Sequence, residues 1–248
     1  MWKYQISLVI LILIGAIVGY LFGSIVFAII ISKSITKTDI RTKGSNNPGF
    51  TNSIRVYGKK IAILVLVLDV LKSVVPVILF YLIYQYVLSK WIGISSNPSS
   101  TNFYDPKIFI YIPGVFAIIG HIFPIYFKFK GGKGVATYGG LCICLSPFIT
   151  LVAIVIIATC VLITKKMSIG SLVSACIVPF LVLVPGINYL YLYNPQISFF
   201  IKNLSYVTVQ LLPVFAMLVL MSGLVIFSHR ENIKKIINKT ENSIISKN

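Results

Sequence analysis

The sequence predicts an all-α polytopic integral membrane protein with about seven transmembrane helices, and three observations support this fold class. Of the 248 residues, 57% are hydrophobic and only 11% are charged, whereas a soluble domain carries about 25% charged residues. Apolar runs recur along the chain at the length of roughly 20 residues that a membrane-spanning helix needs. The basic residues between these runs are concentrated in a few stretches. These features argue against a soluble globular protein.

Apolar segments that we expect to be helical follow one another along the chain. They cover residues 7–31, 61–88, 108–127, 135–163, 171–192 and 205–227. The first is longer than the apolar region of a signal peptide, and no clear small-residue cleavage site follows it. We therefore expect it to be a retained helix.

The distribution of Lys and Arg predicts the topology. Most of the 22 basic residues lie in loops 33–60, 128–134 and 164–171 and in the tail 229–248. The positive-inside rule places these stretches in the cytoplasm, whereas the Ser-, Asn- and Pro-rich residues 89–107 are expected outside. The chain is thus expected to form a single membrane domain, residues 1–248, in a bacterial plasma membrane. Its N-terminus would lie outside and its C-terminus in the cytoplasm.

This topology requires a break within residues 135–163. If that segment crossed the membrane once, Lys165, Lys166 and the basic tail would all fall outside. Pro147 is a natural break, because proline removes a backbone hydrogen bond and bends or ends a helix. A short broken pair of helices at this position restores the orientation and raises the count to seven.

The net charge of +17 is compatible with topology, with anionic lipid headgroups or with an anionic substrate, and composition does not separate these. The cysteines lie in apolar stretches without the spacing of a zinc site or a disulfide framework, and we expect them to be small buried residues. They are Cys142, Cys144, Cys160 and Cys176. We expect no metal, no organic cofactor and no nucleic-acid partner.

Two polar stretches are suited to binding anions. Residues 44–52, GSNNPGFTN, are rich in small hydroxyl and amide residues that let backbone N–H groups approach a ligand. Residues 130–134, KGGKG, place two lysines in a glycine-rich turn that opens into an apolar helix. The second stretch is not a nucleotide-binding P-loop, because Gly134 rather than Ser or Thr follows Lys133 and the upstream glycine is missing. A flexible connector is the alternative interpretation.

The arginines and histidines border the same loops. Arg41, Arg55 and Arg230 lie in the predicted cytoplasmic stretches, and arginine suits bidentate phosphate recognition. His121 precedes the second stretch, and His229 opens the sequence HREN after the last apolar segment. A histidine near neutral pH can act as a general base or as a hydrogen-bonding residue of the fold.

Asp39 and Asp69 are candidate partners for these cations. Asp69 lies inside an apolar segment, where an ionisable side chain is usually functional or paired, and Lys72 follows one turn later. We expect these two residues to pair.

Together, these stretches resemble the bacterial acyl-phosphate:glycerol-3-phosphate acyltransferases, the PlsY family, over nearly the whole chain. The matching motifs are Gly23-Ser24-Ile25, Asp39-Ile40-Arg41, residues 44–55, Gly120-His121 with Phe123-Pro124, residues 129–137 and residues 229–233. The resemblance implies a seven-helix membrane fold with its active site at the cytoplasmic face. It also implies transfer of a fatty acyl group from acyl phosphate to the sn-1 hydroxyl of glycerol 3-phosphate, giving lysophosphatidic acid and phosphate, the first step of phospholipid biosynthesis. A soluble enzyme that makes acyl phosphate is a candidate partner.

The resemblance also assigns the site residues. The catalytic set is Ser45, Arg55, Lys133, His229 and Asn232. The substrate-binding set is Arg41, Asn47, Thr51, Asn52, Lys130, Gly131, Gly132, His121 and Ser171. Asn46 stands where the family usually has glycine, and a left-handed backbone there would be tolerated better by Asn than by most residues. Pro48, Phe50 and Val26 also depart from the family pattern.

The general base stays open at this level. No His is followed four residues later by Asp, so a His–Asp dyad cannot be read from the chain, and the base is either His229 or the phosphate of the substrate. Arg55 and Lys133 are expected to bind phosphates. A transporter or flippase for an anionic phosphorylated solute or lipid, and a non-catalytic lipid-binding protein, are the alternative functions. The polarity collects at one interface rather than at the bilayer midplane, which favours interfacial chemistry.

Overall fold

The computed structural model describes residues 2–84, 86, 106–184 and 211–243, and within these ranges the chain is helical with no β-strand. The α-helices are α1 (Trp2–Gly23), α2 (Phe27–Thr36), α3 (Phe50–Ile83), α5 (Ile112–Ile122), α6 (Val135–Leu145), α7 (Pro147–Thr164), α8 (Met167–Leu181), α10 (Leu211–Ser228) and α11 (Arg230–Ile237). Short 3-10 turns are η1 (Ile40–Thr42), η3 (Pro106–Tyr111) and η4 (Ile125–Phe127).

Helix α1 packs closely along α5, and glycines make this contact possible. A Cβ atom on Gly19 would collide with the backbone of Pro113, and one on Gly23 would collide with that of Ala117. Gly120 of α5 lies equally close to the carbonyl of Tyr20. Small residues let membrane helices approach in this way where no hydrophobic driving force acts between them. Helix α3 packs against both α1 and α5 and completes this half of the molecule.

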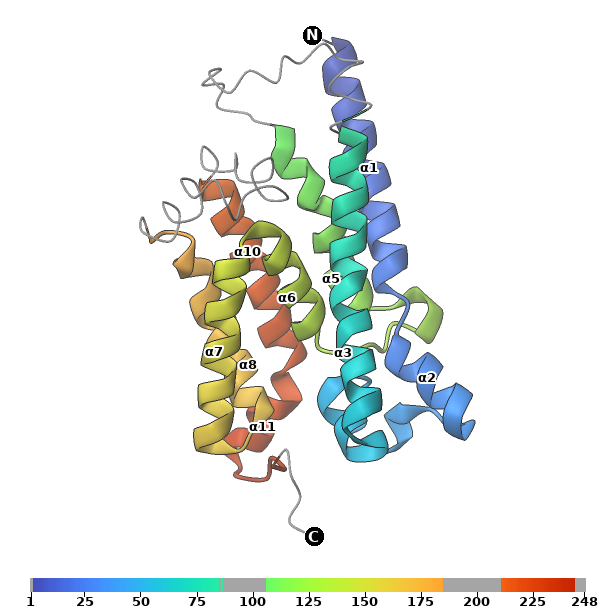
Figure 1. Ribbon diagram of the computed structural model, residues 1–248, viewed down its shortest axis with the longest axis vertical. Helices are drawn as coiled ribbons and strands as arrows, with labels where there is room; N and C mark the ends of the chain where they lie inside the picture. The colour runs from blue at the N-terminus through green and yellow to red at the C-terminus, as the bar shows by residue number, and fades with distance from the viewer. Residues whose placement is uncertain (1, 85, 87–105, 185–210, 244–248) are drawn as a thin grey trace.

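The other half contains α6, α7, α8 and α10. Helix α6 bridges the halves, because it packs against α3 and α5 on one side and α7 on the other. The predicted break is confirmed: α6 ends at Leu145, and α7 begins at Pro147, with the Ser146 side chain accepting a hydrogen bond from the backbone N–H of Ile149 at 3.3 Å. The chain reverses at this break (Figure 1). Helix α7 has 18 residues and is not short.

Four helical stretches are long and apolar enough to cross a membrane, and a fifth results if the bent pair α10–α11 counts as one. The four are Ile6–Thr36, Phe50–Ile83, Phe109–Phe127 and Pro147–Thr164. Helices α6 and α8 are apolar but shorter. Many large apolar side chains on α1, α3 and α7 are exposed, which suits helices facing lipid. The chain is therefore a multi-pass membrane protein.

The helix boundaries differ from the sequence expectations at the polar stretches. Residues 33–60, expected as a loop, are helical up to Thr36 and again from Phe50, and a non-helical kink at Gly58 separates these first turns of α3 from its long apolar part. Likewise, α8 begins at Met167, and the tail contains α11. The charged residues of these stretches lie on exposed helix surfaces. Hydropathy, which detects apolar residues only, therefore misplaces the helix ends. The expected outer loop 89–107 lies almost wholly outside the described residues.

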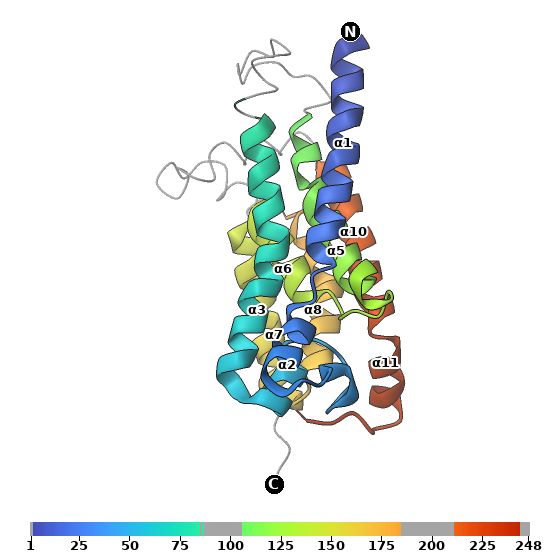
Figure 2. The ribbon, with the colours of Figure 1, turned by 90° about the vertical axis from the view of Figure 1, so that its right-hand side faces the viewer.

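Two of the polar stretches lie at one end of the bundle, and the third lies part-way along it. Figures 1 and 2 show the start of α1 at one end, and α2, the start of α3 and α11 at the other. The turn between α5 and α6 lies between these ends (Figure 1). This arrangement brings the three motif stretches toward each other.

Candidate active site

A cavity of about 620 Å³ opens between the two halves of the bundle. Most of the predicted site residues line it: Ser45, Asn47, Thr51, Asn52, Arg55, His121, Lys133, Ser171, His229 and Asn232. They come from the loop before α3, the first turns of α3, the end of α5, the turn before α6, and helices α8 and α11 with the residue before it. Tertiary structure thus brings residues separated by nearly 190 positions into one site.

The amide of Asn52 organises the loop before α3. Its Oδ1 accepts a hydrogen bond from the Ser45 backbone N–H at 2.8 Å, and its Nδ2 donates to the carbonyl of Lys43 at 2.9 Å and that of Ile40 at 3.3 Å. Asn52 is fully buried. Asn46 has a φ of 60°, so the expected left-handed backbone is present at the residue that replaces the family glycine. The loop is therefore held in a fixed shape at the mouth of the cavity.

Lys133 and His229 meet because the end of α10 is tied to the glycine-rich turn. The Ser228 hydroxyl donates a hydrogen bond to the backbone carbonyl of Lys133 at 2.9 Å. Burial, helped by the neighbouring charges of Arg55 and Lys235 and opposed by that of Glu241, lowers the pKa of Lys133 to about 8. The amino group therefore lies in a site that already concentrates positive charge, as a site for anions requires.

His229 is buried and neutral at physiological pH. Burial first, and the Lys133 charge second, lower its pKa to about 4. Its Nδ1 lies 2.7 Å from the carbonyl oxygen of Val225, so this nitrogen carries the hydrogen and donates it. Nε2 is then the unprotonated nitrogen, which is the form a general base requires.

Arg55 and Asn232 both contact the chain after α11. Nη2 of Arg55 donates to the carbonyl of Ser243 at 3.1 Å and to that of Asn242 at 3.4 Å. Nδ2 of Asn232 donates to Ser168 Oγ and to Glu241 Oε1, each at 2.8 Å. Sequence reasoning missed Ser168 and Glu241, and also Lys235 and Thr240, which line the cavity with them. An acid in a basic tail was the one available signal, since the chain has only 5 acidic residues.

A buried ionic cluster lies deeper, beside His121. The predicted pairing of Asp69 and Lys72 is confirmed, with Nζ of the lysine 2.9 Å from Oδ1 of the aspartate. The same Nζ lies 2.8 Å from His121 Nδ1, and all three side chains are buried. His121 supports the glycine-rich turn in two ways. Its backbone carbonyl accepts a hydrogen bond from the Gly132 N–H at 3.0 Å, and its ring packs so close that a Cβ on Gly132 would collide with it. His121 therefore positions the turn that carries Lys133.

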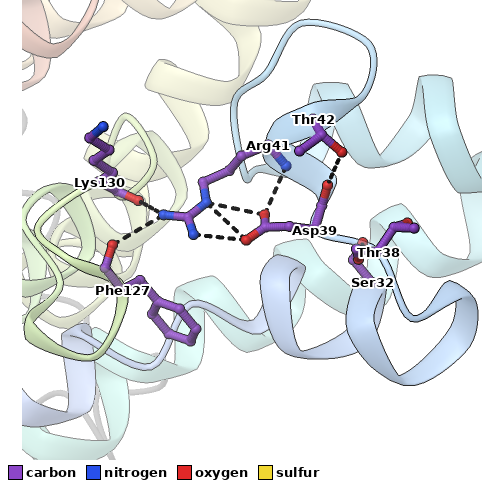
Figure 3. A network of polar contacts seen from close by, with 7 residues as sticks. All are labelled: Ser32, Thr38, Asp39, Arg41, Thr42, Phe127 and Lys130. Carbon is purple, nitrogen blue, oxygen red and sulfur yellow. Dashed lines mark hydrogen bonds and ion pairs between the residues drawn. The ribbon is translucent and has the colours of Figure 1, made fainter.

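Arg41, Lys130, Gly131 and Gly132 do not line the cavity. Arg41 forms an ion pair with Asp39 at 2.7 Å and donates from Nη1 to the carbonyls of Lys130 and Phe127, at 2.9 and 3.1 Å (Figure 3). The Arg41 hydrogen bond holds the pKa of Asp39 below its usual value. This network joins the loop after α2 to the glycine-rich turn. The substrate-binding roles assigned to these four residues stay predictions. Arg41 and the Lys130 carbonyl help to hold the two loops together, whereas Gly131 and Gly132 donate to the carbonyls of Ile122 and His121 at the end of α5.

The rest of the cavity is apolar and lies among α3, α6, α7 and α8. Its lining includes Leu66, Val70, Val135, Ile143, Ala153, Ile154, Ile157, Ala158, Val161 and Val178. The cavity therefore joins a cationic end to an apolar arm. Among the described residues, no group of three His, Cys, Asp or Glu side chains is placed to hold a metal ion.

Comparison with known proteins agrees with this site. The family model for glycerol-3-phosphate acyltransferase matches residues 13–239. The glycerol-3-phosphate acyltransferase of Ureaplasma parvum serovar 3 is 40% identical over 244 residues, which cover 98% of this chain and 93% of that protein. The enzyme of the same name from Mycoplasma pneumoniae is 37% identical over 245 residues, covering 98% of both chains.

Solved structures match as well. The crystal structure of PlsY (YgiH), an integral membrane glycerol 3-phosphate acyltransferase, in its glycerol 3-phosphate form is 29% identical, with a TM-score of 0.68 over 94% of each chain. The lysophosphatidic acid form of the same enzyme is 28% identical with a TM-score of 0.65. From this extent of similarity in sequence and structure, the chain belongs to the glycerol-3-phosphate acyltransferase family.

Proposed function

We propose that this protein transfers a fatty acyl group from acyl phosphate to the sn-1 hydroxyl of glycerol 3-phosphate, releasing lysophosphatidic acid and phosphate. The observation that carries the proposal is the single cavity in which Arg55, Lys133 and the first turn of α3 meet an apolar arm. Two phosphate groups need cations and N–H donors, and a fatty chain needs an apolar slot. Both requirements are met within one cavity of about 620 Å³.

The cationic end would hold the phosphates. Arg55 offers a planar fork for bidentate contact, and Lys133 offers a point charge beside it. Gly49, Phe50 and Thr51 place the start of α3 against the cavity, where the first N–H groups of a helix have no partner within the helix. Ser45 and Asn47 precede this turn and would complete the site. The apolar arm among α6, α7 and α8 would take the acyl chain.

The chemical step is nucleophilic attack on the acyl carbonyl. The hydroxyl oxygen of glycerol 3-phosphate forms the new ester bond to the carbonyl carbon, and the bond from that carbon to the phosphate oxygen breaks. The hydroxyl proton passes to Nε2 of His229 or to a substrate phosphate, and the departing phosphate stays paired with Lys133 and Arg55. His229 is unprotonated at pH 7, as a general base must be, but its pKa of about 4 makes it a weak proton acceptor, which favours the substrate phosphate for this role. Charge stabilisation and proximity supply the rest of the acceleration.

The same arrangement, with the basic loops at one end, supports a placement in the membrane. We place the end with α2, α11 and the Lys165–Lys166 turn in the cytoplasm, with the N-terminus outside, in the plasma membrane of a bacterium. The spanning segments would number seven, with α6 and α7 as the broken pair. The active site would then face the cytoplasm, where glycerol 3-phosphate and a soluble enzyme supplying acyl phosphate are available.

The test is turnover by the purified protein in lipid. Palmitoyl phosphate and glycerol 3-phosphate are incubated with the protein, acyl-CoA and acyl carrier protein thioesters are run in parallel, and phosphate release and lysophosphatidic acid are followed. Product from acyl phosphate alone, lost in Lys133→Ala, supports the proposal. Product from thioesters alone would exclude acyl phosphate as the donor. If the folded protein gave no product from any donor, acyl transfer to glycerol 3-phosphate itself would be excluded.

A further inference from the structure

The chain after α11 turns back across the end of the bundle toward the start of α3 (Figures 1 and 2). Thr240, Glu241 and Asn242 of this segment line the cavity. Two of the residues with proposed roles in catalysis, Arg55 and Asn232, are held by it through the hydrogen bonds described above. This segment after α11 therefore forms one wall of the active site.

Glu241 is the acidic residue of this wall, and its side chain lies among cationic groups. Its Oε1 accepts from Asn232, whereas its Oε2 is buried and has no hydrogen-bond partner among the described residues. A buried carboxylate oxygen without a hydrogen bond is costly unless nearby cations compensate it. The cavity lining supplies such cations from three elements: Arg55 of α3, Lys133 before α6 and Lys235 of α11. The other titratable groups of the lining are neutral His229, the deeper Asp69 and His121, and Tyr138 and Cys142 of α6.

We infer that Glu241 is a positioning residue for glycerol 3-phosphate: its carboxylate fixes the Asn232 amide and balances the cations of the site, so that Lys133 stays charged and ready for phosphate. This inference rests on the proposed function for the identity of the ligand. The geometry favours this role over that of a plug, because the described part of the segment after α11 binds Arg55 through one nitrogen, Nη2, and leaves the other N–H groups of the guanidinium available to a phosphate. Both N–H groups of the Asn232 amide are already used, by Ser168 and Glu241, which fixes its orientation.

Two substitutions separate the two parts of this role. Glu241→Gln keeps a hydrogen-bond acceptor for Asn232 but removes the charge, whereas Glu241→Ala removes both. Glu231→Gln is the matched control, because Glu231 is an exposed acid of α11 that pairs with Lys234 at 3.7 Å and does not line the cavity. Each full-length variant is purified in lipid, and its folding is checked by thermal unfolding before any comparison.

The measurements are the KM for glycerol 3-phosphate and kcat between pH 6.5 and 9.5, together with direct binding of glycerol 3-phosphate and of inorganic phosphate. We expect Glu241→Ala to weaken glycerol 3-phosphate binding by roughly 10-fold at pH 7.5, the scale of one lost charged interaction. In both variants at Glu241, the pH at which affinity falls should move below that of the wild type. Glu241→Gln should keep most of the wild-type kcat, whereas Glu241→Ala should not. Glu231→Gln should match the wild type throughout.

An unchanged pH profile in both Glu241 variants would overturn the inference, because a purely structural tail would lower stability without moving the titration. Tighter binding of phosphate in Glu241→Ala would also overturn it and would make the carboxylate a plug of the site. Failure of the proposed function is recognised separately: the wild type would give no product from any donor, while the phosphate-binding profiles of the variants would still test Glu241.

Discussion

The depressed pKa of Lys133 predicts how substrate affinity depends on pH. Burial, the charge of Arg55 and that of Lys235 lower this pKa to about 8, so the free site loses a positive charge as the pH rises through that value. A phosphate dianion binds the charged form of the lysine, so above pH 8 binding must be accompanied by uptake of a proton. The affinity for glycerol 3-phosphate should therefore be highest below pH 8 and fall above it.

The magnitude follows from the titration curve. With a pKa of about 8, about 90% of the free protein carries the Lys133 charge at pH 7 and about 10% carries it at pH 9. The KM for glycerol 3-phosphate should thus rise by roughly 10-fold between these values, which corresponds to about 1.4 kcal/mol of binding free energy. The substrate does not contribute, because a phosphate monoester with its second pKa near ~6 is a dianion throughout this range. His229, with a pKa of about 4, also stays neutral.

The assay is the KM for glycerol 3-phosphate at saturating acyl phosphate, with direct binding of glycerol 3-phosphate as a second measurement. The control is Lys133→Arg, because an arginine stays charged across the whole range and should give a flat profile. A constant KM up to pH 9.5 in the wild type would refute the reasoning. So would a decline in affinity of the same size in Lys133→Arg, since another group would then be titrating.

Three further predictions concern the fold and the acyl chain. Lys72→Met should lower the free energy of unfolding by about 3–5 kcal/mol, because it leaves a buried carboxylate unpaired. Adding Asp69→Asn should recover most of this loss in thermal unfolding, and equal losses in the single and double variants would contradict the role of the ion pair. Asn52→Ala should cost about 1–3 kcal/mol and raise the KM for glycerol 3-phosphate, because it frees the loop that the buried Asn52 amide holds; a loss of stability with an unchanged KM would separate the loop from the site. Gly139→Val should shift acyl-phosphate use toward shorter chains, because Gly139 lines the cavity and a Cβ there meets open space. Gly223→Val, also in open space but away from the cavity, is the control, and a similar shift in both would contradict this assignment.

The helical membrane fold could be predicted because hydropathy and charge are properties of local sequence. The break before Pro147 and the pairing of Asp69 with Lys72 were also predictable, since each depends on residues at most a few positions apart. The ends of the helices were less predictable from the sequence. Hydropathy marks where apolar side chains stop, and the expected start at position 61 lies close to the kink at Gly58, whereas the polar turns of α3 before that kink, from Phe50, were not expected.

The motifs indicated which residues carry the chemistry, but not how they divide the work. Arg41 and Arg55 read alike in sequence, as arginines in basic loops of one motif. The structure separates them, because Arg41 is held by Asp39 and two loop carbonyls outside the cavity, whereas Arg55 faces into it. Asn52 was expected to line a phosphate site; it lines the cavity, and its amide also holds the loop that shapes the site.

The sequence by itself determined that the chain is a helical membrane protein, and its ordered motifs indicated the family, because period, composition and motif spacing are carried by neighbouring residues. Only the tertiary structure decided that a tail acid, Glu241, lies against Asn232 in the same cavity as Arg55 and Lys133. No local pattern encodes that contact. It arises because the closely packed helices set the directions in which their loops and the tail leave the bundle, and those directions converge on one buried site.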